Sequence, residues 1–165
     1  HEAPIPSVLK EAEKWKRFFE SCKSIGFRFG SSLGATKFMF GIQMPVMALI
    51  KATTVGGKYA KNEKSSGDVN RMSSKDSTDV LIKNELVPVT SYMPDFDALT
   101  ENKNKIFIAC GDYGLKINAW YAQVSQALSQ RISCELVTFP GHHASFMDMP
   151  VEWTNTLVSV LKRFD

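Results

Sequence analysis

The sequence predicts an α/β fold, and two observations indicate it. Two apolar runs of strand length, residues 105–110 and 134–139, flank a single amphipathic helical pattern. A parallel strand that is buried on both faces gives such a nearly continuous apolar run. In the first hundred or so residues, by contrast, apolar side chains recur at helical spacing. The chain therefore combines a helical part with a strand–helix–strand unit.

Three helices and one short helical piece are expected before the strands. They cover about residues 7–22, 34–52, 74–86 and the residues after 94. Ser7 offers an N-cap oxygen behind Pro6, and Pro45 is expected to break or kink the second helix. Residues 24–29 are a doubtful strand. Residues 56–77 are rich in Gly, Lys, Asn and Ser and are expected to form a surface loop.

After the first strand, residues 111–114 predict a turn, and the following helix repeats apolar residues at i, i+3, i+4, i+7 and i+11 from Ile117. The second strand ends at Pro140, and a loop leads to a closing helix over 151–164. That helix carries an apolar stripe of Trp153, Leu157, Val160, Leu161 and Phe164. Two parallel strands alone do not make a stable sheet, so we expect them to be one edge of a larger sheet and the fold to be incomplete.

Composition excludes several classes. The 165 residues are 44% hydrophobic and 22% charged, which excludes a disordered chain. The net charge of +3 is too small to indicate a nucleic-acid or membrane partner, and the most apolar stretch, 38–50, is shorter than the ~20 residues of a spanning helix. Three cysteines cannot all pair within one chain and indicate a reducing, cytoplasmic compartment. Glycine-rich phosphate motifs and CxxC pairs are absent from the sequence, and no cofactor is expected.

The strongest signal for chemistry is Pro140-Gly141-His142-His143, which follows the carboxyl end of a buried strand. Ligands of open α/β sheets bind at this end of the strands. Histidine, with an unperturbed pKa of ~6.5, suits proton transfer at neutral pH. Two solvated loop histidines are the structural alternative. A zinc or other metal site is disfavoured, because adjacent histidines lack Cys or carboxylate companions at ligand spacing.

Taken in order, these features resemble the C-terminal part of an α/β-hydrolase. Residues 3–100 are similar to its helical cap domain, and residues 101–165 to the last part of its core. Residues 1–2 then correspond to the end of a preceding core strand. The segments 84–92 and 94–99 also look like the cap-to-core connection of bacterial and fungal hydrolases.

The resemblance implies specific residues for the catalytic histidine and its acid. In this family a helix often opened by Pro follows the histidine by about seven residues, which implies His143 and leaves His142 as the alternative. The acid usually lies three residues after a Gly that follows the penultimate strand, where this chain has Gly114. Some hydrolases carry the acid just before the cap, and Glu2 is similar to that acid. Asp112 is the alternative acid. The purely structural interpretation of Asp112 is a turn-forming residue that bonds its own backbone.

A convincing nucleophile is missing from the chain. Residues 30–34 fit G-x-S-x-G with Ser32 at the centre, but this motif works only as a strand-to-helix turn. A helix-entry loop is the favoured interpretation, and Ser32 is the second choice. Because the chain begins at His1, we expect an upstream segment or a companion chain to supply the nucleophile, in a cleaved chain or heterodimer.

The resemblance therefore implies a hydrolase that cleaves an ester, lactone or similar carbonyl substrate with a Ser-His-acid triad. The expected partners are a small apolar ester-like substrate and the companion segment, without nucleic acid or membrane. The alternatives are a non-catalytic hydrolase-like binding module, and a dehalogenase or epoxide hydrolase with an Asp nucleophile. An apolar cluster is expected to form core or to line an acyl pocket. Its members are Phe38, Met39, Phe40, Met44 and Met47.

Overall fold

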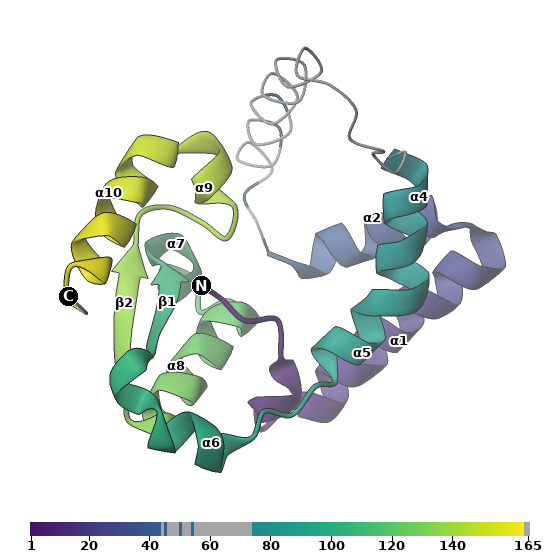
Figure 1. Ribbon diagram of the computed structural model, residues 1–165. Helices are drawn as coiled ribbons and strands as arrows, with labels where there is room; N and C mark the ends of the chain where they lie inside the picture. The colour runs from purple at the N-terminus through teal and green to yellow at the C-terminus, as the bar shows by residue number, and fades with distance from the viewer. Residues whose placement is uncertain (44, 46–49, 51–53, 55–73, 164–165) are drawn as a thin grey trace, which may run out of the picture.

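A computed structural model describes residues 1–43, 45, 50, 54 and 74–163 (Figure 1). Of the sequence-based expectations, Met44, Met47, residues 56–73 of the expected loop and Phe164 lie outside these residues. The described chain combines several helices with two strands, so the mixed α/β class is confirmed. None of the described helices has both the length and the apolar character needed to cross a membrane.

The part before the strands is helical. It contains the 3-10 turn η1 (Pro6–Val8), α1 (Ala12–Phe29), α2 (Ser31–Gly41), α4 (Ser74–Val80), the π-helical turn η2 (Leu81–Glu85), α5 (Leu86–Thr90), α6 (Phe96–Glu101) and the 3-10 turn η3 (Lys103–Lys105). The short piece expected after Pro94 is therefore present as α6. Its N-cap is Asp95, whose Oδ1 accepts hydrogen bonds from the backbone N–H groups of Asp97 and Ala98.

The part that holds the strands has the expected element order. It contains β1 (Phe107–Gly111), α7 (Asp112–Lys116), α8 (Trp120–Ile132), β2 (Glu135–Phe139), α9 (Ser145–Asp148) and α10 (Pro150–Leu161). The two strands pair in parallel, with Phe107 opposite Glu135 and Gly111 opposite Phe139, and α8 connects them. The strand–helix–strand unit is confirmed. The short helix α7 replaces the simple turn expected at 111–114.

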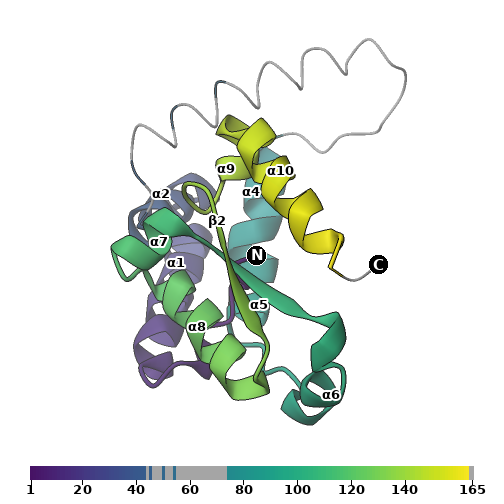
Figure 2. The ribbon, with the colours of Figure 1, turned by 90° about the vertical axis from the view of Figure 1, so that its left-hand side faces the viewer.

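Each face of the small sheet is covered by a helix, which explains the apolar strand sequences. Ile108 and Cys110 of β1 belong to the core that includes α8, whereas Ala109 packs with Val160 of α10. Figure 2 shows α8 and α10 on opposite sides of the two strands. Alternate residues of one strand therefore enter two different cores, as strand geometry requires.

The N-terminal residues lie beside β1. The backbone N–H of Glu2 donates a hydrogen bond of 2.9 Å to the carbonyl of Ala109, and the N-terminus is drawn next to β1 in Figure 1. Because β2 pairs with one edge of β1, this contact lies on the other edge. The described residues place two strands in the sheet. The assignment of residues 1–2 to the end of a preceding strand stays a prediction.

The first helix differs from its predicted bounds at both ends. α1 begins at Ala12 instead of Ser7, whose hydroxyl donates to the carbonyl of Tyr92 at 2.5 Å and caps no helix. α1 then continues to Phe29, so the doubtful strand over 24–29 is wrong. A short run of alternating apolar residues does not distinguish the two structures by itself, and here packing against α2 keeps the segment helical.

The other two helices of this part also have different bounds. α2 begins three residues before the predicted start and ends at Gly41, and residues 44, 46–49 and 51–52 of the predicted helix lie outside the described residues. α4 begins at Ser74, where the third helix was predicted to start, so residues 74–77 are helical and do not belong to the expected loop. The helical path continues through η2 and α5 to Thr90, four residues beyond the predicted end at 86. Pro88 lies in this path. A proline removes a helical N–H donor, and its ring clashes with the carbonyl four residues earlier. For Pro88 that residue is Asn84, which belongs to the wider π-helical turn η2.

One core joins the helical part to the sheet. Phe19 of α1, Ile82 of η2 and Leu86 of α5 are buried in the same cluster as Trp120 and Tyr121 of α8. The indole N–H of Trp120 also donates to the carbonyl of Gly41 at the end of α2. The helices therefore pack directly on the unit that carries the strands. The division into a cap over 3–100 and a core over 101–165 stays a prediction.

Candidate functional site

The site begins with Glu2, which is 1% exposed. One oxygen of its carboxylate, Oε1, accepts hydrogen bonds from the backbone N–H of Gly111 (2.8 Å) and from Sγ of Cys110 (3.2 Å). The backbone of Glu2 has a φ of +50°, in the left-handed region that costs a non-glycine residue about 1–3 kcal/mol. The hydrogen bonds at both its backbone and its side chain hold this conformation in place.

The second oxygen of Glu2 binds His143. Its Oε2 lies 2.6 Å from Nδ1 of His143, and the two residues are 141 positions apart in the chain. Because a carboxylate only accepts hydrogen bonds, Nδ1 carries the proton in this pair and Nε2 of a neutral ring keeps its lone pair. The side chain of His143 is 42% exposed while that of Glu2 is fully buried. The acid is thus hidden and the histidine stays reachable.

Asp112, the alternative acid, has a different role. Its exposed carboxylate accepts a hydrogen bond of 2.6 Å from the backbone N–H of Gly141, and the N–H of Tyr113 donates back to the carbonyl of Gly141. These bonds fasten the loop after β2 to the end of β1. The structure therefore brings Glu2 to the side chain of His143. It brings Asp112 to the backbone of the loop that carries His143.

This loop leaves no space for a side chain at two glycines. Gly141 has a φ of +79°, and a Cβ there would overlap the hydroxyl of Ser145. A Cβ on Gly111 would lie 2.6 Å from the carbonyl oxygen of Gly141 and 3.3 Å from Oε1 of Glu2. The ends of the two strands and the acid therefore approach one another more closely than alanine would permit.

His142, the alternative histidine, is turned into the loop. It is 6% exposed, and its Nε2 lies 3.2 Å from Oδ2 of the buried Asp148. Its Nδ1 accepts from the N–H of Ala144, and its own N–H donates to the hydroxyl of Ser145 at 2.5 Å. Both ring nitrogens and the backbone N–H of His142 therefore bind groups of the same loop and of α9. His143 is the histidine that remains available to a reactant.

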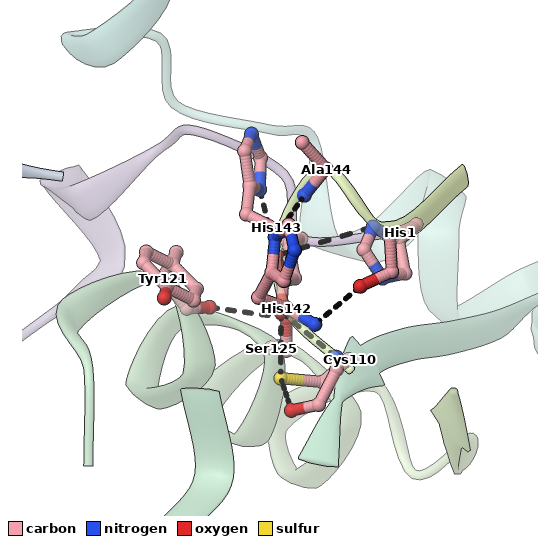
Figure 3. Close-up of polar contacts among 10 residues, drawn as sticks. His1, Cys110, Tyr121, Ser125, His142, His143 and Ala144 are labelled. Carbon is pink, nitrogen blue, oxygen red and sulfur yellow. Dashed lines mark hydrogen bonds and ion pairs between the residues drawn. The ribbon is translucent and has the colours of Figure 1, made fainter. Parts of the chain in front are cut away.

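Figure 3 shows how parts of the chain far apart in sequence meet here. His1 and Cys110 lie on one side of the histidine pair, and Tyr121 lies on the other. The ring centroids of Tyr121 and His143 are 5.5 Å apart. Burial, together with the neighbouring Glu2 carboxylate, raises the pKa of both the Cys110 thiol and the Tyr121 phenol. Both groups therefore stay neutral at physiological pH and leave Glu2 as the acidic partner of His143.

A cavity of about 240 Å³ lies beside the pair. Its wall is largely apolar and comes from the segment around Glu2, from α2, η2, α5 and α8, and from the loop after β2. The lining residues are Glu2, Pro4, Phe38, Ile42, Leu81, Glu85, Leu86, Val89, Thr90, Trp120, Tyr121 and His143. Of the apolar cluster predicted from the sequence, Phe38 lines this cavity, whereas Phe40 is 84% exposed.

One group of side chains in the described part could approach a metal ion. His1, Glu2 and His143 each offer a ligand atom, and these atoms lie within 4.8 Å of one another. However, Oε2 of Glu2 and Nδ1 of His143 already bind each other at 2.6 Å, whereas Nδ1 of His1 is 4.0 Å from the same oxygen. The donor set therefore fits a hydrogen-bonded acid–histidine pair better than a metal centre.

Ser32 does not form a nucleophile elbow. The motif needs a strand before the serine, but α1 precedes it and Gly30 joins two helices. The exposed Ser32 lies in the first turn of α2, beside a groove that also includes Lys75 and Asp79. In the part of the chain that the structure describes, no hydroxyl or thiol hydrogen-bonds to Nε2 of His143. The strand-to-helix interpretation of residues 30–34 is therefore wrong.

No protein-family model, no curated protein and no solved structure matches this chain. Sequence reasoning named Glu2 and His143, which the structure brings together, and Phe38 as a possible pocket residue, but it did not anticipate the other residues that line the cavity. Trp120 and Tyr121 were assigned to the apolar face of a helix, which is correct but does not reveal that they also border His143. Their position at the start of the helix that follows β1, near the carboxyl end of the strands, was the available signal.

Proposed function

We propose that this chain supplies the acid–histidine half of a hydrolase active site, in a protein of the α/β-hydrolase type. The observation that carries the proposal is the 2.6 Å hydrogen bond between buried Glu2 and His143, whose second ring nitrogen has no bond in the described residues. A buried acid that fixes the tautomer of an accessible histidine is the arrangement that general-base catalysis needs.

The reaction that this pair supports is acyl transfer to a hydroxyl nucleophile and then to water. Nε2 of His143 takes the proton of the nucleophile as its oxygen bonds to the substrate carbonyl carbon. The imidazolium then gives that proton to the leaving oxygen as the carbon–oxygen bond of the ester breaks. In the second half, His143 activates a water molecule in the same way and the acid product leaves. Glu2 stabilises the imidazolium in both halves.

The nucleophile would come from residues outside those described, in an upstream segment or a companion chain. A hydrogen bond on the edge of β1 that does not pair with β2 supports this proposal. There the backbone N–H of Glu2 donates to the carbonyl of Ala109, as a residue of a neighbouring strand would. A further strand beside β1 would end near Glu2 and His143, where parallel strands place their carboxyl ends. The two strands described here would then be the last two of a larger hydrolase sheet, with the helices α1 to α5 as the cap.

The cavity favours a small substrate with an apolar body, such as a short-chain ester or a lactone. Its volume of about 240 Å³ lies below the 300–1,000 Å³ typical of sites for drug-sized ligands. Phe38, Ile42 and Leu81 contribute apolar surface, while Glu85 and Glu2 are the acidic members of the lining. Two carboxylates without a lysine or arginine in the lining disfavour an anionic substrate.

A serine-reactive fluorophosphonate tests the proposal on the protein purified with whatever segments or chains accompany these residues. We expect the label on a serine outside residues 1–165, and His143→Gln to slow labelling by about 10²–10⁴-fold, the contribution of a general base. His1→Gln is the matched control, because His1 lies beside the same carboxylate without bonding it closely, and it should label at the normal rate.

Other outcomes identify the alternatives. A label on Ser32 would contradict the proposed location of the nucleophile. Hydrolysis without labelling, with ¹⁸O from water entering an aspartate, would indicate a dehalogenase or epoxide hydrolase. Neither labelling nor turnover of any ester or lactone would indicate a non-catalytic binding module.

A further inference from the structure

The helical pair α1 and α2 carries an exposed apolar face that the proposed site does not use. Phe29 is 65% exposed, Leu33 is 55% exposed and Phe40 is 84% exposed. Together with half-buried Phe18 and Ile25 they border one shallow groove between the two helices. We call these five residues the α1–α2 face. Contiguous exposed apolar surface of this kind marks an interaction site more often than scattered single residues do.

The face is formed by helical periodicity on both helices. Phe18, Ile25 and Phe29 are separated by seven and four residues, which places them on one side of α1. Leu33 and Phe40 are seven residues apart and share one side of α2. In Figure 1 both helices lie in the part of the molecule away from the two strands. The face is thus separate from the Glu2–His143 pair, although α2 also contributes Phe38 to the cavity.

Positive charge is concentrated on the same two helices. Residues 12–41 contain six basic and two acidic residues, a net charge of +4, whereas the whole chain has +3. At ~100° per residue, Glu13 and Glu20 project about 140–160° away from Phe18, on the far side of α1, as do Lys16 and Lys23, which leaves Arg28 and Lys37 as the cations near the groove. Glu11, just before α1, is paired with Lys14 at 3.0 Å. The charge beside the apolar groove is therefore positive.

Two of the cations lie directly over the aromatic rings of the face. Nζ of Lys37 is 6.0 Å from the centre of the Phe18 ring, and the guanidinium carbon of Arg28 is 5.7 Å from the centre of the Phe29 ring. Long cationic side chains of this kind cover apolar surface with their stems and keep the charge at its rim. This combination of rings and rim cations is typical of helices that lie in the interface of an anionic bilayer.

We propose that the α1–α2 face docks the protein on an anionic lipid surface. The apolar side chains enter the boundary between headgroups and acyl chains, and Arg28 and Lys37 meet the lipid phosphates and carboxylates. The helices lie on the membrane and do not cross it, which agrees with the absence of a spanning helix among those described. The net charge of the chain alone predicts no membrane partner, because it averages over the two helices and the remainder.

Flotation with lipid vesicles tests this proposal without any need for activity. We expect the chain to bind vesicles of phosphatidylcholine with a quarter phosphatidylglycerol at least tenfold more tightly than pure phosphatidylcholine vesicles. Phe40→Ser should weaken binding by at least about tenfold, since burial of one such ring contributes roughly that factor or more. Val151→Ser is the matched control, because Val151 is 67% exposed on α10 and should bind like the unchanged chain.

Charge reversal gives a second, independent variant. Arg28→Glu combined with Lys37→Glu should reduce binding to the anionic vesicles by more than about 25-fold, at about fivefold for each basic residue removed. Lys103→Glu combined with Lys116→Glu changes the net charge equally at exposed positions elsewhere and should have a much smaller effect. Equal losses in both pairs, no vesicle binding, or a Phe40-dependent dimer in solution would overturn the proposal.

Discussion

The two carboxylate oxygens of Glu2 have different hydrogen-bond partners. Oε1 is held by the backbone of Gly111 and the thiol of Cys110, so the side chain does not rotate freely. Oε2 then faces Nδ1 of His143 in a fixed direction. A residue in a strained left-handed backbone conformation next to two buried neutral groups is costly for the fold, and such cost is found where geometry matters for function.

The thiol of Cys110 makes the fold sensitive to alkaline pH. Burial and the Glu2 carboxylate raise its pKa in the folded state, while the unfolded thiol titrates near ~8.5. Its contribution to stability is therefore complete below that value and is lost as the pH rises above it, by up to about 1.4 kcal/mol per pH unit. Tyr121 acts in the same direction from its own unfolded pKa near ~10.

Thermal unfolding followed from pH 7 to pH 10.5 measures this effect. Cys110→Ser keeps a donor for Glu2 but does not titrate in this range, so its melting temperature should fall less steeply above pH 9 than that of the unchanged chain. Both proteins should show similar slopes between pH 7 and pH 8. Parallel curves over the whole range would show that Cys110 is not responsible.

At the level of elements, the loop between β2 and α10 is built as a rigid mount for His143. Asp112 and Tyr113 fasten Gly141, the second residue after β2, to the end of β1. Inside the loop, His142 bonds to Ser145 and to Asp148 of α9. Pro150 then opens α10 with a backbone angle that suits the first helical turn. These bonds leave the side chain of His143 partly exposed.

Asp148→Ala tests this mount. It removes the partner of a buried imidazole N–H and should lower the free energy of unfolding by about 1–3 kcal/mol. Asp148→Asn retains an acceptor oxygen and should lose less. Urea unfolding measures both, with Glu152→Ala on the exposed side of α10 as the control. An Asp148→Ala protein as stable as that control would mean that the His142–Asp148 pair does not brace the loop.

How far the elements were predictable depends on how much of the information is local. Residues 105–110 and 134–139 were recognised as strands within two residues, because burial on both faces gives an apolar run that is visible in the sequence. Residues 24–29 were wrongly expected to form a doubtful strand. Their strand-like alternation is also compatible with a helix, and contact with α2 decides the structure. The passage of the helix through Pro88 also rests on a π turn that no local pattern indicates.

On the scale of the whole molecule, the site joins the start of the chain to the loop after its last strand, β2. Residue 2 reaches residue 143 because both lie at the carboxyl end of β1, one beside its free edge and one beyond its neighbour β2. The sequence predicted Glu2 and His143 through a resemblance and left Asp112 and His142 open. Periodicity does not indicate which of two acids meets which of two histidines, because that depends on contacts between segments that are distant in the chain.

The same scale explains why most of the residues that line the cavity were not predicted. Its wall collects residues from α2, η2, α5 and α8, and each of them is an ordinary apolar position in its own helix. Phe38 and Phe40 are two residues apart and have the same side chain, yet one faces the cavity and the other is exposed. The packing of α2 on its neighbours makes this distinction.

The most direct test of the Glu2–His143 pair is the tautomer of His143, measured by long-range ¹H–¹⁵N NMR correlations of the histidine rings at a pH where they are neutral. We predict a proton on Nδ1 and none on Nε2 in the unchanged chain and in Asp112→Asn, and a mixture of tautomers in Glu2→Gln. A mixture already present in the unchanged chain, or one produced by Asp112→Asn and not by Glu2→Gln, would contradict the assignment of Glu2 as the acid that orients His143.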